Sequence, residues 1–299
     1  MSPEPPTPQP SATVILLRRE GGNPSVYLLR RNPHSGFMGG FYVFPGGTVE
    51  AQDRHPDWYR HMDIHPRQFE ERFGGNGSSN EILAYLVAAV RETLEEAGVL
   101  LGYKPEAFGS NDADRAHRLR CGEDMPREWF RKAISSEGWK LAASRIHRWA
   151  RWVTPEQMQR RFDTRFFLTG LPEYLHGRPD GHETVHGIWL SPRQALAANS
   201  EGRTPLSPPT LMTMQELLFY ETFDSLLKAA EKRHWGNVRM PRLVRLDGGE
   251  RLILAPWDPA YRQRDLDIEP GRATLLVAGA AFSRMLLKDG VWRPISAGI

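Results

Sequence analysis

The sequence predicts an α/β fold with a mixed sheet, and three observations support this expectation. The 299 residues are enough for one large domain or two small ones, each with a real hydrophobic core. Apolar residues make up 40% of the chain and charged residues 25%, which excludes a wholly disordered or fibrous protein. Short β-branched segments typical of strands and a strong amphipathic helix occur together in the same part of the chain.

The charge balance and the cysteine count exclude further classes of protein. A formal net charge of +3 is too small to indicate a nucleic-acid partner. The single cysteine, Cys121, excludes an intrachain disulfide and a cysteine-based metal site. The apolar run Ala273–Phe282 is well short of the roughly 20 residues that a membrane helix needs, so we expect no membrane partner.

Residues 1–12 predict a disordered, proline-rich tail. Five prolines lie between Met1 and Pro10, and the segment has neither the basic nor the apolar part of a signal peptide. The last three residues, Ala-Gly-Ile, differ from a Ser-Lys-Leu peroxisomal signal. A cytoplasmic location is therefore expected.

The first elements predicted after the tail are three strands. Thr13–Leu17 and Val26–Leu29 are apolar and β-branched, and the turn residues Gly21–Pro24 between them indicate a hairpin. Phe41–Phe44 is a third predicted strand, which ends at Pro45–Gly47.

The strongest helix is predicted over Glu81–Ala97. Ser78 and Glu81 have the spacing of a capping box, and Gly98 is a typical stop. At about 100° per residue, one face of this helix is apolar. That face carries Leu83, Leu86, Val87, Val90, Leu94 and Ala97.

Three carboxylates, Glu92, Glu95 and Glu96, project from the opposite face of this helix. Their like charges repel one another, and Arg91 is the only cation in the same turn. Two interpretations are open on the helix alone. One is an ordinary solvated acidic face, and the other is a site for a hard divalent cation with oxygen ligands.

Other elements are predicted with less detail. Residues 54–80 are polar and rich in His, Pro and Gly, which indicates an inserted segment rather than core. The methionine and aromatic residues of Leu211–Tyr220 follow a helical spacing, which indicates either core packing or an interface stripe. A homodimer through the long helix that contains them is one interpretation. The remaining predictions are charged, partly helical residues 103–140, strands Phe166–Leu168 and Val185–Leu190, helix Pro192–Ala198, the long helix Thr210–Arg233, and β hairpins over the last 60 residues.

The end of the carboxylate helix, together with an upstream glycine pair, resembles the Nudix box of the Nudix hydrolases. That box is Gly, five residues, Glu, seven residues, then Arg-Glu-U-x-Glu-Glu-x-Gly-U, where U is bulky and apolar. Arg91–Val99 matches its last part, and Gly46-Gly47 ends the preceding strand. Two positions depart from the pattern. Asp53 replaces the first Glu, with 37 residues instead of seven before Arg91, and Thr93 replaces an apolar residue.

A long insertion inside the box is similar to the branch of the family that includes a peroxisomal CoA and acyl-CoA diphosphatase. The CoA signature of related enzymes ends in Gly-x-x-x-Phe-Pro-Gly-Gly, which Gly40 and Phe44–Gly47 match. Arg31 matches the first Arg of that signature, whereas Gly36 replaces its second Arg and Leu29 its Thr. The resemblance thus implies that Arg31, Gly40, Phe44, Gly46 and Gly47 bind substrate.

The resemblance also implies the architecture and the remaining site residues. It implies a Nudix α/β/α sandwich over residues 13–205 with insertions at about 54–80 and 103–145. Residues 206–299 then form a helical and β extension packed on the core. It implies Glu92, Glu95 and Glu96 as ligands of Mg²⁺ or Mn²⁺, with Arg91 orienting a carboxylate. Glu183, six residues before Trp189, becomes a possible general base or a loop residue in solvent. The implied catalytic residues are Arg91, Glu92, Glu95, Glu96 and Glu183.

The implied chemistry is hydrolysis of a diphosphate linked to a nucleoside. A diphosphate diester is negatively charged and repels an incoming hydroxide, and bound metal both neutralises that charge and acidifies a bound water. CoA or acyl-CoA is the preferred substrate. The alternatives are ADP-ribose, NADH or another nucleoside diphosphate derivative, or a non-catalytic module that senses a nucleotide.

Two histidine patterns offer rival metal sites. His182-Glu183-Thr184-Val185-His186 fits the His-Glu-x-x-His zinc protease motif, which requires a helix. The neighbouring Pro and Gly residues and the β-branched residues favour a loop and a strand there. His55, His61 and His65 could share a helix face, but Pro56 and Pro66 argue against a continuous helix and favour a solvated insertion.

Overall fold

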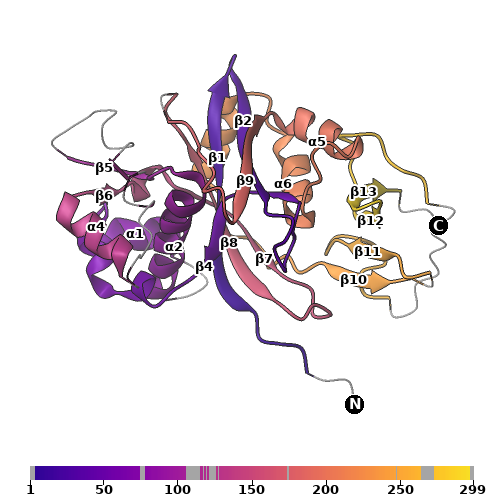
Figure 1. Ribbon diagram of the computed structural model, residues 1–299, viewed down its shortest axis with the longest axis horizontal. Coiled ribbons are helices and arrows are strands. Elements are labelled where there is room, and N and C mark those ends of the chain that lie inside the picture. Colours follow the sequence, from indigo (N-terminus) through magenta and orange to yellow (C-terminus); the bar gives the residue numbers. More distant parts are fainter. Residues whose placement is uncertain are drawn as a thin grey trace.

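A computed structural model places a seven-stranded mixed sheet at the centre of the molecule (Figure 1). It describes residues 4–74, 78–105, 128–173, 175–246, 248–263 and 273–296, with Arg115, Ala116, Arg118, Arg120 and Pro126. The strand order is β3-β2-β1-β8-β7, with β4 on β1 and β9 on β2, and only the β1–β8 pair is parallel. The strands are β1 (Gln9–Glu20), β2 (Asn23–Arg31), β3 (Tyr42–Val43), β4 (Gly46–Thr48), β7 (His147–Val153), β8 (Phe162–Gly170) and β9 (Thr184–Leu190). The predicted α/β class with a mixed sheet is confirmed.

The N-terminal hairpin forms as predicted, but two boundaries differ. β1 and β2 pair through a turn at Gly21 and Gly22. β1 starts at Gln9, so residues 9–12 pair with β8 instead of extending the predicted tail. Gly46 and Gly47 do not simply end a strand; they form β4 against Ala12 and Thr13.

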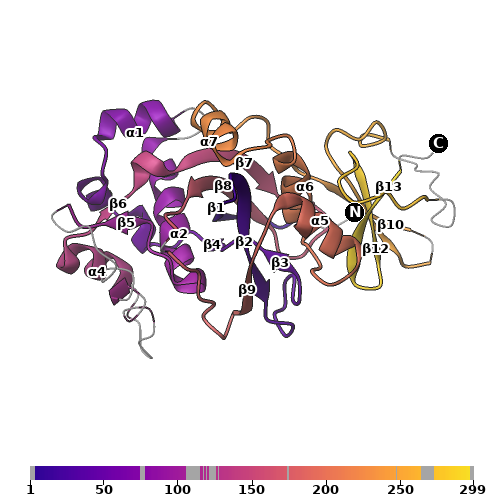
Figure 2. The same cartoon turned by 90° about the horizontal axis from the view of Figure 1, so that it is seen from above.

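One face of the sheet is covered by α2 (Ser79–Ala97) and by the two insertions. α2 begins at Ser78, whose hydroxyl accepts the Glu81 N–H, and ends at Gly98 in the left-handed conformation. Beside it lie η2 (Pro56–His61), α1 (Pro66–Phe73) and α4 (Trp129–Glu137) (Figure 2). All six apolar residues predicted for the buried face of α2 are buried.

The prediction that residues 54–80 lie outside the core was wrong. Trp58, Phe69 and Phe73 have no exposed surface and join the hydrophobic cluster under α2. The segment is polar on average, but its few aromatic residues fall on the inner sides of η2 and α1. A polar composition therefore concealed an amphipathic pattern that is only one or two turns long.

Two histidines of this insertion, His55 and His65, cap helices. The Nδ1 of His55 accepts the Asp57 N–H at the start of η2, and the Nδ1 of His65 accepts the Arg67 N–H at the start of α1. Pro56 and Pro66 occupy the first position of each helix, where a proline costs no hydrogen bond. The prolines thus separate two helices, as predicted, and the capping roles favour the structural interpretation.

The opposite face of the sheet is covered by α5 (Pro192–Ser200), α6 (Pro208–Leu217) and α7 (Phe223–Glu231). The predicted single helix Thr210–Arg233 was wrong, because α6 ends at Leu217 and a new helix starts after Thr222. The Thr222 hydroxyl accepts the Ser225 N–H and caps α7. The methionines and leucines of α6 pack into the core rather than forming an exposed stripe.

The C-terminal region adds a second, four-stranded antiparallel sheet beyond α5 and α6, on the side away from α2 (Figure 1). Its strands are β10 (Arg242–Arg245), β11 (Arg251–Leu254), β12 (Arg284–Lys288) and β13 (Val291–Ile295). The predicted hairpins are therefore present. One face of this sheet joins the second hydrophobic cluster of the central sheet, and the other face buries a small cluster of its own.

The remaining short elements are η1 (Gln52–Arg54), η3 (Ala143–Arg145) and the two-stranded sheet of β5 (Gly102–Tyr103) and β6 (Lys140–Leu141). Among the residues that the structure describes, no helix is long and apolar enough to cross a membrane. Cys121 lies outside the described residues.

Candidate active site

One cleft of about 1160 Å³ gathers nearly all the predicted site residues. It runs from the end of α2, past β4 and the edge strands, to the C-terminal sheet. Gly40 is the exception among the predicted residues, because its N–H closes a loop on the Arg31 carbonyl instead. The cleft-lining predicted residues are Arg31, Phe44, Gly46, Gly47, Arg91, Glu92, Glu95, Glu96 and Glu183.

The glycine pair allows the β4 loop to approach the acids of α2. The Gly46 N–H donates to the Glu96 Oε2 at 2.9 Å. A Cβ atom on Gly47 would collide with the Glu92 carboxylate, and one on Gly46, which has a φ of 155°, would collide with Thr13. Position 46 therefore needs glycine because the Ala12 and Thr13 backbone lies against it, whereas a side chain at position 47 would displace the Glu92 carboxylate.

Arg91 is a buried hub that holds several acids. Its Nε and Nη2 donate to the two Asp53 oxygens at 3.1 and 2.9 Å, a forked pair. Its Nη1 donates to Glu92 at 3.0 Å and to Glu95 at 2.6 Å. Asp53, which replaces the usual Glu of the box, thus orients Arg91 from a position with no exposed surface.

The three glutamates do not form a solvated face. Their side chains are 14%, 27% and 4% exposed for Glu92, Glu95 and Glu96. Burial raises the pKa of Glu96 to about 8, and burial together with the neighbouring acids raises the pKa of Glu92 and of Glu95. The site therefore gathers more carboxyl groups than Arg91 can pair, and burial disfavours their charged forms unless a further cation is present.

Arg31 and Glu183 reach the same group of acids from other elements. The Arg31 Nη1 lies 3.8 Å from the Glu96 Oε1, and its buried Nε has no hydrogen-bond partner among the described residues. Glu183 lines the cleft just before β9, and its charge adds to the raised pKa of Glu96. The loop that carries Glu183 is tied to the Arg31 loop, because the Asn32 N–H donates to the Glu183 carbonyl.

The chemistry of these donors fits a hard divalent cation. Three carboxylates with raised pKa values line one side of a cleft, and oxygen ligands are those that Mg²⁺ and Mn²⁺ prefer. As the side chains stand, no three His, Cys, Asp or Glu residues in the described part of the chain are close enough to hold one ion. Glu92 and Glu95 turn to Arg91 instead, so a shared ion requires their side chains to rotate.

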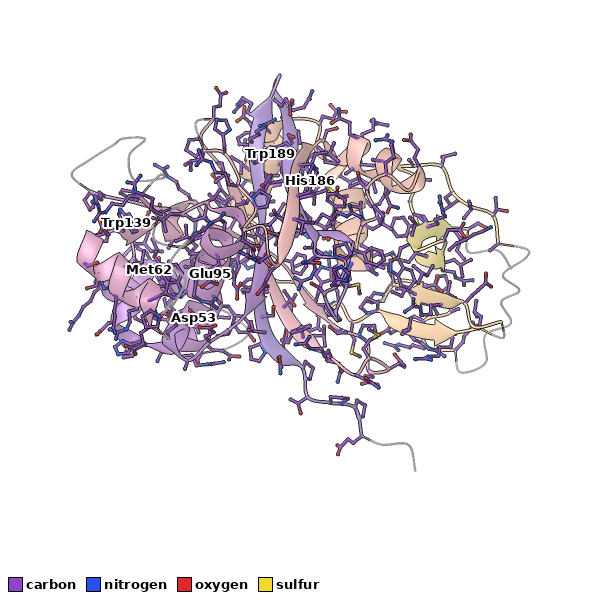
Figure 3. All side chains as sticks on the ribbon, in the orientation of Figure 1. Asp53, Met62, Glu95, Trp139, His186 and Trp189 are labelled. Carbon is purple, nitrogen blue, oxygen red and sulfur yellow. The ribbon has the colours of Figure 1, made fainter. Side chains whose placement is uncertain are left out.

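The rival zinc motif does not form. β9 starts at Thr184, so His182 and His186 lie in a loop and a strand rather than one helix turn apart. The His186 Nδ1 is 3.2 Å from the Tyr42 hydroxyl. Figure 3 shows His186 along β9, apart from Glu95 and Asp53 on the α2 side of the sheet. The expectation of a loop and strand there is confirmed.

Sequence reasoning missed one neighbour of the acids. The Trp129 Nε1 donates to the Glu95 Oε1 at 3.1 Å, and Trp129 lines the cleft from the start of α4. The second insertion therefore contributes directly to the site. No local signal in the sequence marks this residue, because a tryptophan at a helix start in a charged segment normally indicates packing only.

Comparison with known proteins decides the family. Residues 8–217 match the family model of the NUDT19 Nudix domain. The chain belongs to the NUDT19 Nudix family. The Nudix hydrolase predicted from Arg91–Val99 is thereby confirmed.

Several known proteins are similar to this NUDT19-family chain. The acyl-coenzyme A diphosphatase NUDT19 of Homo sapiens is 30% identical over 274 residues, which cover 78% of this chain and 71% of that protein. The protein of the same name from Gallus gallus is 27% identical and covers 87% and 81%. A NUDIX hydrolase crystal structure from Alicyclobacillus acidocaldarius has a TM-score of 0.56 at 22% identity, covering 74% of this chain and 96% of that one, which supports the fold.

Proposed function

We propose that this protein is a metal-dependent hydrolase that cleaves the diphosphate linkage of CoA or acyl-CoA, releasing a phosphoadenosine phosphate and a phosphopantetheine. The observation that carries the proposal is the excess of buried acids beside Gly46-Gly47 in one large cleft. Such a site suits a diphosphate only with a cation present. The relatives of this chain include proteins named acyl-coenzyme A diphosphatase NUDT19, and these names support CoA or acyl-CoA as the substrate.

We assign the roles within this site as follows. Glu92, Glu95 and Glu96 hold Mg²⁺ or Mn²⁺, which supplies charge neutralisation at the diphosphate and a more acidic water. Arg91 positions Glu92 and Glu95, because it donates to both while Asp53 fixes its own orientation.

The remaining roles concern the substrate and the proton. Arg31 lines the cleft with a side chain that is 22% exposed, and its guanidinium binds a phosphate oxygen. Glu183, an exposed residue of the cleft lining, accepts the proton of the attacking water. Phe44 and the Gly46-Gly47 backbone shape the floor under the diphosphate.

The test is the product spectrum of the purified protein with CoA. With Mg²⁺ or Mn²⁺ present, mass spectrometry should show phosphopantetheine and phosphoadenosine phosphate, and a chelator should abolish both. ADP-ribose, NADH and a dinucleoside polyphosphate at equal concentration test the alternative substrates. Turnover of one of these in preference to CoA contradicts the CoA assignment. Tight nucleotide binding by calorimetry without any turnover contradicts the enzyme and favours a sensor.

Two further parts of the proposal concern the setting of the enzyme. A cytoplasmic location and a homodimer through the α6–α7 region remain predictions. Scattering from the protein in solution tests the second, since a monomeric mass contradicts it.

A further inference from the structure

The far end of the cleft is built by the C-terminal sheet. Leu243 pairs with Ile253 across β10 and β11, and Leu287 pairs with Trp292 across β12 and β13. Directly opposed residues on neighbouring strands point to the same face of a sheet. These four residues all line the cleft, and we call them the C-terminal wall.

The C-terminal wall is apolar and continuous with apolar residues of the Nudix core. Phe37, Met158 and Trp152 line the same cleft. Leu287 is only partly buried, so part of the wall is open to a ligand. Arg251 opposes Leu287 on the neighbouring strand and is exposed. Among the described residues of the C-terminal sheet, it is the one charged residue that lines the cleft.

Two features indicate what the wall contacts. The cleft of about 1160 Å³ exceeds the roughly 300–1,000 Å³ typical of sites for drug-sized ligands, so it has room for an extended, multipart substrate. The wall residues offer mainly aliphatic and aromatic surface, and the Trp292 indole N–H is the only side-chain hydrogen-bonding group among these four residues. An apolar chain therefore suits this end, as a diphosphate suits the acidic end.

The similarity to acyl-CoA diphosphatases also reaches this region. The family model ends at residue 217, whereas the match to the Gallus gallus protein covers 87% of this chain. That alignment must therefore include residues of the C-terminal region. The alignment with a protein named for an acylated substrate therefore includes Leu243 and Ile253 of the wall, whatever its bounds.

We propose that the C-terminal wall binds the acyl chain of acyl-CoA while the acids of α2 act on the diphosphate. This inference rests on the proposed function. Each methylene group that leaves water adds up to about fourfold in affinity. The extension would then select acylated over free CoA without taking part in the chemistry.

The experiment measures kcat/KM for free CoA and for acetyl-, octanoyl- and decanoyl-CoA. For the wild type, the ratio of decanoyl-CoA to free CoA should be about tenfold or more. Leu287→Gln should lower this ratio about tenfold, because it places a polar amide in the wall. Lys288→Gln is the matched control, since residue 288 is exposed on the next position of β12, and it should leave the ratio unchanged.

A second variant guards against misfolding. Leu287→Trp keeps the wall apolar but fills space, so it should reduce turnover of decanoyl-CoA far more than that of acetyl-CoA. Equal turnover of all chain lengths by the wild type overturns the inference but leaves the proposed function standing. The inference is also overturned, with the proposed function still standing, if Leu287→Gln lowers kcat/KM equally for free CoA and decanoyl-CoA. Absence of turnover with every CoA substrate contradicts the proposed function itself.

Discussion

Two buried Arg–Asp pairs in this molecule have the same fork geometry but different surroundings. Arg91 donates to the two Asp53 oxygens at 3.1 and 2.9 Å, and Arg284 donates to the two Asp258 oxygens at 2.8 and 3.1 Å. Asp258 also accepts the Ser283 hydroxyl and the Ala260 N–H. Burial opposes its ionisation, but these donors hold the pKa of Asp258 below its ordinary value.

The Arg91 network is not balanced in this way. Arg91 also serves Glu92 and Glu95, and burial raises the pKa of Asp53 and of both glutamates. The Arg284–Asp258 pair is balanced, whereas the acids around Arg91 outnumber the cations that pair with them, so burial disfavours their ionisation beside the cleft. The comparison indicates that the Arg284–Asp258 pair maintains the fold, whereas the Arg91 network is suited to receive a cation.

The largest expected effect comes from Glu96→Gln. The variant keeps the shape of the side chain but removes one of the charges that we assign to the ion. We expect kcat to fall on the order of a thousandfold, with the thermal unfolding temperature little changed, because burial raises the pKa of Glu96 to about 8 and already favours its uncharged form without metal. Steady-state rates with CoA and calorimetric melting check this. Near-normal turnover would remove Glu96 from the ligand set.

Arg91→Met should cost both stability and activity. It leaves Asp53 buried without a partner, and breaking a buried ion pair costs roughly 3–5 kcal/mol; we expect about 3 kcal/mol because Glu50 N–H still donates to Asp53. Urea unfolding measures the loss. The double variant Arg91→Met with Asp53→Leu should regain most of that stability while remaining inactive. Recovered activity in the double variant would contradict the positioning role of Arg91.

The local parts of this site were predictable from the sequence. The apolar period of 81–97 placed the helix, and the acid spacing placed Glu92, Glu95 and Glu96 together on one side of it. The resemblance implied that Gly46 and Gly47 belong to the site, and both line the cleft, close to Thr13 and Glu92. These features depend on a few neighbouring residues, so a single sequence contains them.

The parts that failed depend on residues far apart in the chain. Trp129 meets Glu95 across 34 positions, and the C-terminal wall begins at Leu243, 146 residues after α2 ends at Ala97. Burial of Trp58 and Phe69 was missed because the segment around them is polar on average. The break near Thr222 was missed because its capping hydroxyl competes with a hydrophobic pattern that continues through it.

Arg284→Met should lower stability without lowering activity. We expect a loss of about 2 kcal/mol near neutral pH, because Asp258 keeps two other donors but loses its counter-charge. Asp258 is ionised in the wild type down to below its ordinary pKa of 3.8, so its contribution disappears as the pH falls through that lower value. In the variant, protonation of Asp258 removes its unpaired charge. The difference in unfolding free energy between the wild type and the variant should therefore shrink as the solution is acidified. Urea unfolding from pH 7 to pH 3 measures this, and a large change in kcat/KM would contradict the structural assignment.

Trp129→Phe should have the smallest effect. It removes the indole N–H that Glu95 accepts but keeps a ring in contact with Phe130. A hydrogen bond to a charged group contributes roughly 1.5–3 kcal/mol, and we expect a smaller loss of about 1 kcal/mol in metal-binding free energy, because Glu95 is partly exposed and keeps Arg91. A role in positioning Glu95 predicts that the Mg²⁺ or Mn²⁺ concentration for half-maximal rate rises about fivefold with the melting temperature unchanged.

The matched control for Trp129 is Trp257→Phe. Trp257 also donates its indole N–H, to the Phe282 carbonyl, but it lies outside the residues that line the cleft. This change should leave the metal dependence at its wild-type value. If Trp129→Phe lowers the melting temperature and leaves the metal dependence unchanged, the second insertion supports the fold alone. The acid network that differs from the Arg284–Asp258 pair would then consist of residues from α2, β4 and η1, without a contribution from α4.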